Sequence, residues 1–109
     1  MNKLTDEDQI HINAIKSLLL QKYEGLIISI YCYGSRVTQN VKDTDFDILL
    51  LTKTKIDWKT EYEMSQIIVR YGIYHDIVFD PQFMCKDEFE LKQAKFPYVQ
   101  NVKLANVVI

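Results

Sequence analysis

The chain has 109 residues, of which 48% are hydrophobic and 26% are charged, and its net charge is −2. This composition is ordinary for a soluble globular protein and argues against disorder, and the length predicts a single domain over residues 1–109. The mixed charges include no Lys/Arg run, which argues against strong nonspecific binding to nucleic acid. No apolar run approaches the ~20 residues of a membrane helix, so we expect a cytoplasmic protein without membrane contact.

The first element that the sequence predicts is a helix that begins after Thr5. A threonine hydroxyl can cap free N–H groups at a helix start, and the acids at 6–8 suit the positive end of the helix dipole. Apolar residues then recur at helical spacing as far as Tyr23, and Gly25 is a typical stop. This helix is expected to cover a sheet.

Two strands are predicted next. Residues 26–33 (LIISIYCY) are rich in β-branched and aromatic residues, as in a buried strand, and residues 45–51 (DFDILLL) predict a second strand. The polar stretch between them, which opens with Gly34, Ser35 and Arg36, is compatible with either a short helix or a loop.

A second helix is predicted to begin after Asp57, a good N-cap, and to close at Gly72. A third strand is predicted over 73–79 and stops at Pro81. Residues 86–94 could form a short charged helix, and 107–109 suggest a returning extended segment. This order of elements predicts an α/β fold, with a single mixed sheet and flanking helices.

The cysteines and histidines are not spaced like zinc ligands. Cys32 and Cys85 form no CxxC motif, and we expect both to be free thiols in a reducing cytosol. His11 and His75 have no second ligand at zinc spacing, so structural or surface roles are favoured.

Asp45 and Asp47 are candidate metal ligands. Residues two apart on a strand point to the same face, so the two carboxylates would share one small volume. Like charges held together favour a bound cation, and hard oxygen ligands suit Mg²⁺ or Mn²⁺. Taken alone, Asp-x-Asp is also common at solvated strand ends.

Gly34, Ser35 and Arg36 are candidate nucleotide ligands. A glycine directly after a buried strand lets a phosphate approach the backbone, Ser35 adds a hydroxyl and an N–H, and Arg36 adds positive charge. By themselves these residues are explained more simply by a turn glycine and a capping serine. Their combination with the paired acids is hard to explain by chance.

The segments YGSR at 33–36 and DTDFDILL at 43–50 together resemble the Gly-Ser and Asp-x-Asp signature of polymerase-β-like nucleotidyltransferases, and more narrowly a minimal nucleotidyltransferase. The resemblance implies the palm-like fold of that family over most of the chain. It also implies that Gly34 and Ser35 hold the triphosphate of an NTP, with ATP favoured, and that Asp45 and Asp47 bind two Mg²⁺ or Mn²⁺ ions.

The family also has a third acid on a nearby strand. Asp76 and Asp80 lie on one face of the segment 73–80 (IYHDIVFD), and either could fill this role. We assign Asp76, because it lies inside the apolar run, whereas Asp80 is next to Pro81 and could cap a turn. Asp80 is the alternative.

The resemblance further implies an enzyme that transfers a nucleoside monophosphate, AMP from ATP, to an acceptor hydroxyl on a protein, a small molecule or an RNA end. The partner it implies is a HEPN-type helical protein in a toxin–antitoxin pair. Many family members carry a second glycine soon after Gly-Ser, where Gln39 or Asn40 stands here. The alternative is therefore a weak or inactive binding module that masks such a partner. In a domain this small, a partner chain or a second copy could also complete an exposed apolar face.

Overall fold

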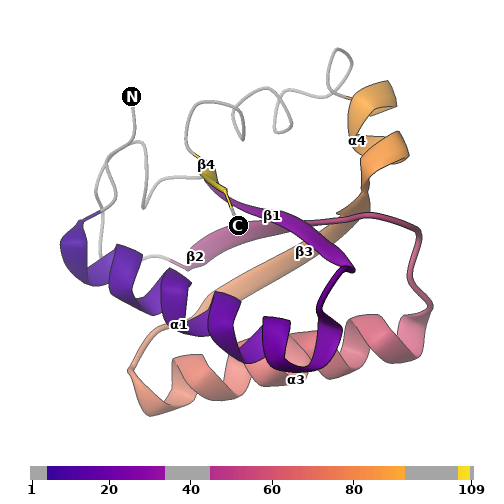
Figure 1. Cartoon of the computed structure of the whole chain (residues 1–109). Helices are drawn as coiled ribbons and strands as arrows, with labels where there is room; N and C mark the ends of the chain where they lie inside the picture. Colours follow the sequence, from indigo (N-terminus) through magenta and orange to yellow (C-terminus); the bar gives the residue numbers. More distant parts are fainter. Residues whose placement is uncertain (1–4, 34–44, 93–105, 109) are drawn as a thin grey trace.

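A four-stranded sheet forms the middle layer of the molecule (Figure 1). The computed structural model describes residues 5–33, 45–92 and 106–108. α1 and α3 lie side by side under one face of the sheet, and α4 follows β3 on the other side. In chain order the elements are α1 (Asp6–Tyr23), β1 (Ile27–Tyr33), β2 (Phe46–Thr52), α3 (Trp58–Tyr74), β3 (Phe79–Cys85), α4 (Lys86–Lys92) and β4 (Asn106–Val108).

The strands combine two directions of pairing. β1 is antiparallel to both β2 and β4, whereas β2 and β3 run parallel, and the strand order is β3-β2-β1-β4. Parallel neighbours need a crossover, which α3 provides between β2 and β3. The predicted α/β fold with a single mixed sheet and flanking helices is therefore confirmed.

Both long helices begin at the predicted caps. The hydroxyl of Thr5 accepts a hydrogen bond from the amide of Asp8 at 3.0 Å, and Oδ1 of Asp57 accepts one from the amide of Thr60 at 2.8 Å. Each bond satisfies an N–H group that has no partner within its own helix. α1 ends before Gly25, which has a φ of 82°, a conformation that glycine adopts without steric cost.

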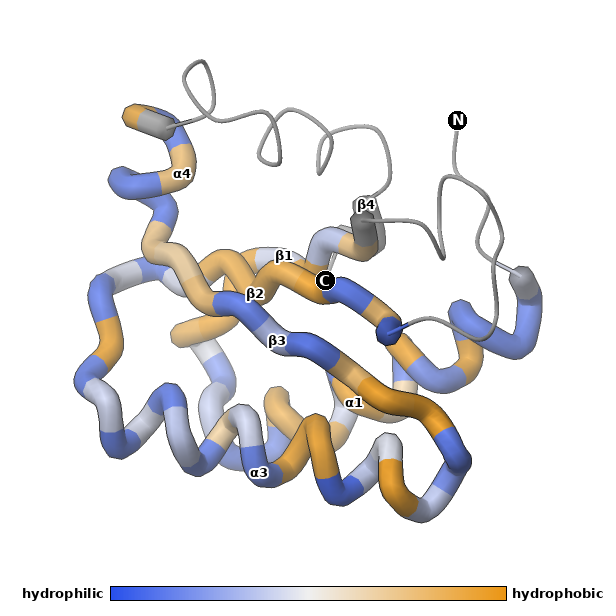
Figure 2. Tube along the Cα trace, turned by 180° about the vertical axis from the view of Figure 1, so that it is seen from behind, coloured by the Kyte–Doolittle hydropathy of each residue, from blue (hydrophilic) through white to orange (hydrophobic). Residues whose placement is uncertain are grey.

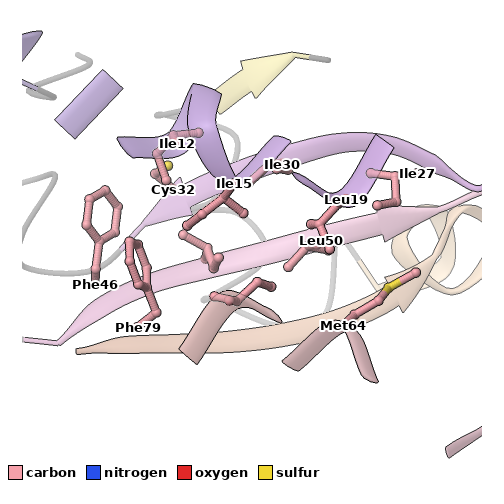
Figure 3. Packing of buried hydrophobic residues seen from close by; sticks show 12 residues of the cluster. Ile12, Ile15, Leu19, Ile27, Ile30, Cys32, Phe46, Leu50, Met64 and Phe79 are labelled. Atoms are coloured by element: carbon pink, nitrogen blue, oxygen red, sulfur yellow. The ribbon is translucent and has the colours of Figure 1, made fainter. Parts of the chain in front are cut away.

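The main hydrophobic core lies between the sheet and the two long helices (Figure 3). α1 contributes Ile12, Ile15 and Leu19 at helical spacing, and α3 contributes Met64 and Ile68, all of them fully buried. The alternate residues of β1, β2 and β3 that face these helices complete the cluster. They are Ile27, Ile30, Cys32, Phe46, Ile48, Leu50 and Phe79.

The third strand lies further along the chain than predicted. The predicted strand over 73–79 is wrong, because α3 continues to Tyr74 and β3 includes Pro81. The amide of Phe46 donates to the carbonyl of Val78 at 2.7 Å. Because backbone groups alternate in direction along a strand, Pro81 then directs its nitrogen away from β2 and toward the open edge of the sheet. An edge strand tolerates proline at such a position. Figure 2 shows a hydrophilic stretch within this strand, in contrast to the mostly hydrophobic β2.

The two cysteines, Cys32 and Cys85, are free thiols, as predicted. Cys32 is buried in the core, and burial, followed by the negative charge of Asp8, raises its pKa to about 12. Of the helices in the described part of the chain, none combines the length and the apolar character needed to cross a bilayer.

Candidate functional site

Two carboxylates meet where β2 and β3 begin. Asp47 is the second residue of β2 and Asp80 is the second residue of β3, and the parallel register places the two opposite each other. On its other side Asp47 is paired with Tyr33, the last residue of β1. One end of the sheet therefore brings together the end of β1 and the starts of β2 and β3.

Both carboxylates lie on the face of the sheet that α1 and α3 leave uncovered. Phe46 and Phe79, the residues just before them, point into the core, where their rings stack at 5.2 Å between centroids. Side chains alternate between the two faces of a strand, so Asp47 and Asp80 point the opposite way. Asp47 is half-buried and Asp80 is exposed. The core thus orients the two acids.

The electrostatics of Asp47 reflect its neighbours. Partial burial raises the pKa of Asp47, and the negative charges of Asp80 and Asp45, together with a hydrogen bond to Asp80, raise it further. Nε2 of Gln82, two residues along the same face of β3, donates to Oδ1 of Asp80 at 3.3 Å. The pair therefore consists of two like charges that repel each other when both are ionised.

A cation would relieve this repulsion, because carboxylate oxygens are the hard ligands that Mg²⁺ and Mn²⁺ prefer. Asp45 is exposed and directly precedes β2. Within the described residues, no three His, Cys, Asp or Glu side chains are already grouped closely enough to hold a metal ion. The fold presents a pair, Asp47 and Asp80, with Asp45 contributing its charge from the adjoining segment. The donor set fits a divalent cation.

Asp76 is not in a strand, so its predicted placement is wrong. It lies in the turn after α3 with a φ of 55°, which is the left-handed conformation. The amide of Ile77 donates to the carbonyl of Gly72 at 2.9 Å, the bond that closes a helix when the residue between cap and strand is left-handed. Aspartate tolerates this conformation better than most residues. Asp76 therefore helps to end α3, and Asp80, the alternative third acid, is the one that β3 places opposite Asp47.

The predicted nucleotide ligands, Gly34, Ser35 and Arg36, lie outside the described residues. Of this motif the structure describes the preceding Tyr33, whose Cα is paired with that of Asp47. Sequence reasoning did not single out Gln82. The only signal for it was its two-residue spacing from Asp80, which places both on one face of a strand once β3 is known.

No protein-family model matches the sequence, and no curated protein matches it either. Solved structures do match. A mutant of the toxin–antitoxin complex MntA–HpeT is 21% identical over 90% of this chain and 70% of that one, with a TM-score of 0.58. The complex of a tri-AMPylated Shewanella oneidensis HEPN toxin with an MNT antitoxin is 21% identical over 92% of this chain and 69% of that one, with a TM-score of 0.56.

The chain has the fold of the minimal nucleotidyltransferases. A further MntA–HepT complex is 23% identical over 69% of this chain, with a TM-score of 0.47, and the chain spans only about half, 54%, of its length. The resemblance drawn from Gly-Ser and Asp-x-Asp is thus confirmed for the minimal nucleotidyltransferase fold. Asp47 and Asp80 lie at the end of the sheet where β1 ends at Tyr33, the first residue of the YGSR segment.

Proposed function

We propose that this chain transfers AMP from ATP to an acceptor hydroxyl, and that Asp45, Asp47 and Asp80 carry the reaction. The observation that supports this most directly is the register that sets Asp47 against Asp80. The pKa of Asp47 is raised by partial burial and, further, by the negative charges of Asp80 and Asp45. Two acids held together by the backbone of two parallel strands are costly for a fold unless the site has a use for their charge.

The three carboxylates would hold divalent cations, Mg²⁺ or Mn²⁺. When bound, such ions lower the pKa of an attacking hydroxyl and stabilise the charge of a departing pyrophosphate. The chain itself orients the ligands: the pairing of β2 with β3 fixes two of them, and the buried Phe46 and Phe79 keep both side chains on the open face. Gly34, Ser35 and Arg36 remain our proposed ligands of the triphosphate, as part of the segment that follows Tyr33.

The proposed step is a displacement at the α-phosphate. The acceptor oxygen forms a bond to the α-phosphorus, the bond from that phosphorus to the bridging oxygen breaks, and pyrophosphate leaves. The proton of the acceptor hydroxyl passes to a carboxylate of the site or to water. Alignment and charge stabilisation supply most of the rate gain in such a reaction, so the loss of one acid should be severe.

We further propose that the acceptor is a hydroxyl of a HEPN-type partner protein. The support is the similar complex in which a HEPN toxin carries AMP groups and is bound to an MNT antitoxin. In this role the chain would modify and restrain a toxin.

The test is transfer of label from ATP, radiolabelled at the α-phosphate, to a co-expressed HEPN-type protein in Mg²⁺ or Mn²⁺. Asp47→Asn and Asp80→Asn should each lower the rate at least ~100-fold, as the removal of a charge-stabilising group does. Asp76→Asn is the matched control, because asparagine also tolerates the left-handed conformation, and it should keep full activity. Loss of transfer in Asp76→Asn with transfer preserved in Asp80→Asn would restore the assignment to Asp76.

A second candidate function is a binding module that masks a HEPN-type partner without chemistry. Its support is the absence of a second glycine after Gly-Ser, where Gln39 or Asn40 stands, because close approach of the backbone to the phosphates is then less complete. Titration of ATP by calorimetry with and without Mg²⁺ separates the two functions. Binding that requires Mg²⁺ favours the enzyme, whereas stable co-purification of the partner with no ATP binding favours the mask.

A further inference from the structure

The outer face of α3 carries an apolar stripe that nothing in the described chain covers. Trp58, Tyr62, the small Ser65 and Val69 recur at intervals of four, three and four residues, the spacing of a coiled-coil seam. Ile73 follows about one turn after Val69 on the same side of the helix. Trp58 is 74% exposed, Tyr62 is 60% exposed and Ile73 is 73% exposed. A different face of the same helix, about a third of a turn away around its axis, points into the core through Met64 and Ile68. α3 therefore has two apolar faces, whereas a surface helix needs one.

The stripe contains a hole of the kind that receives a side chain from a second helix. A hollow in the surface is bounded by Trp58, Glu61, Tyr62 and Ser65. These four residues stand at i, i+3, i+4 and i+7, which is the set that forms a hole in knobs-into-holes packing. The hollow lies at the N-terminal half of the stripe, and the branched, half-exposed Val69 lies in the C-terminal half.

We propose that α3 packs against α3 of a second copy of this chain, antiparallel and about a two-fold axis between residues 65 and 66. This axis relates Trp58 to Ile73 and Tyr62 to Val69, so each aromatic side chain meets an aliphatic one. It also places Val69 of the partner copy over the hollow of the first copy. The smallest residue of the stripe, Ser65, lies beside the axis, where the helices come closest.

Charge and area agree with self-association. The five stripe positions carry no charge, and the exposed charged residues beside them on α3 balance: Lys59 and Arg70 against Glu61 and Glu63. A surface that meets its own copy must not carry a net charge, since identical surfaces would repel. A specific interface buries about 800 Å² on each partner. Three large side chains exposed by 60% or more supply a large part of that area.

The dimer leaves the candidate site open. Asp47 and Asp80 lie on the face of the sheet opposite α1 and α3, as Figure 1 shows for the layers. The interface and the carboxylate pair are therefore on opposite sides of the molecule. Self-association does not depend on the proposed transferase activity.

The first test is sedimentation equilibrium of the full chain over a range of concentrations. We expect a monomer–dimer equilibrium that Val69→Glu shifts at least ~10-fold toward monomer, since it buries a charge in each half of the interface. Val69→Ile should keep the dimer. Leu91→Glu, at a residue of α4 that is 75% exposed, is the matched control and should also keep it.

The second test is oxidative cross-linking in a Cys85→Ser background, where the remaining Cys32 is buried. Ser65→Cys should cross-link to its own copy, because it lies beside the axis. Ile73→Cys alone should not, but a mixture of Ile73→Cys with Trp58→Cys should. Cross-linking of every single variant would indicate parallel helices and overturn the proposed geometry.

Two further results would overturn the proposal. One is a wild-type chain that stays monomeric at its highest soluble concentration. The other is a dimer that Val69→Glu leaves unchanged, because the copies would then meet through another surface. If the chain alone is monomeric and Val69→Glu instead releases a HEPN-type partner, the stripe binds that partner and the self-pairing is wrong.

Discussion

The two faces of the sheet are built from the same strands but differ in what covers them. Toward α1 and α3, β2 places Phe46, Ile48 and Leu50, all fully buried. Toward the other face it places Leu49 and Leu51, which pack with Phe89 of α4, and, at the start of the strand, Asp47. Alternation along one strand thus serves both a core and a site.

The comparison of the two faces shows where this fold can hold two like charges close together. The face covered by α1 and α3 holds the larger hydrophobic cluster, which consists of residues from three strands and two helices. The hydrophobic cluster on the second face is small. Repulsion between Asp47 and Asp80 falls at one end of the sheet, on the face that α1 and α3 leave uncovered. The core can therefore stabilise the protein while the acids remain close together.

Breaking the helix-covered face should have the largest effect. Ile15→Ala removes a fully buried side chain of α1 and leaves a cavity, which should lower the free energy of unfolding by about 2–5 kcal/mol. Urea denaturation followed by circular dichroism measures this loss. Binding of Mn²⁺ to the folded fraction should be unchanged, and a weakened Mn²⁺ affinity would show that the two faces are coupled.

The junction between α3 and β3 should be the next most sensitive point. A Cβ at Gly72 would meet the backbone carbonyl oxygen of Ile77 and come to 3.0 Å from Cδ2 of Phe79. The clash in Gly72→Ala should therefore cost about 1–3 kcal/mol of stability, because the obstructing atom belongs to the backbone. Alanine gains ~1 kcal/mol over glycine in a helix, which offsets only part of this cost. Thermal denaturation measures the net loss, with Ser65→Ala as a near-neutral control. An unchanged midpoint would mean that the turn relaxes freely.

Removal of the α3 cap should cost less. Asp57→Ala deletes the carboxylate that accepts from the amide of Thr60, and the expected loss is ~1 kcal/mol. Asp57→Asn keeps an acceptor oxygen and should recover most of it. Denaturation of the three proteins side by side tests the cap, and equal stability of the alanine and asparagine variants would contradict it.

On the face of the sheet that α1 and α3 leave uncovered, a substitution should raise the stability of the protein rather than lower it. The folded-state pKa of Asp47 is raised, so its contribution to stability is fully present below its unfolded pKa of about 3.9 and is lost as pH rises through the folded value. Without divalent cations, Asp47→Asn should therefore be slightly more stable than the wild type at neutral pH. Melting temperatures in EDTA from about pH 3 to 7 measure this. A variant that is less stable at neutral pH would show that Asp47 makes favourable contacts instead.

Several elements could be predicted because their signals are local. The caps Thr5 and Asp57, and the strands that became β1 and β2, each follow from a few adjacent residues. The shared face predicted for Asp45 and Asp47 rests on the two-residue period of a strand, but β2 begins at Phe46, so Asp45 stands just before the strand.

The acid that stands opposite Asp47 in the sheet could not be predicted that way. Pro81 and Asp76 mislead when read locally, because proline usually ends a strand and an acid inside an apolar run suggests a strand position. The edge position of β3 makes Pro81 acceptable, and the helix closure at Gly72 places Asp76 in a left-handed turn.

The sequence by itself therefore determined the type of fold, since a cap or an alternating strand depends only on neighbouring residues, and it proposed Asp45 and Asp47 as site residues. Only the tertiary structure decided that Asp80 stands opposite Asp47, because strand register depends on segments distant in the chain. The apolar stripe on the outer face of α3 could be recognised only from the sequence and the tertiary structure together. Its spacing is in the sequence, but the packing of Met64 and Ile68 against the sheet decided which apolar face is left exposed.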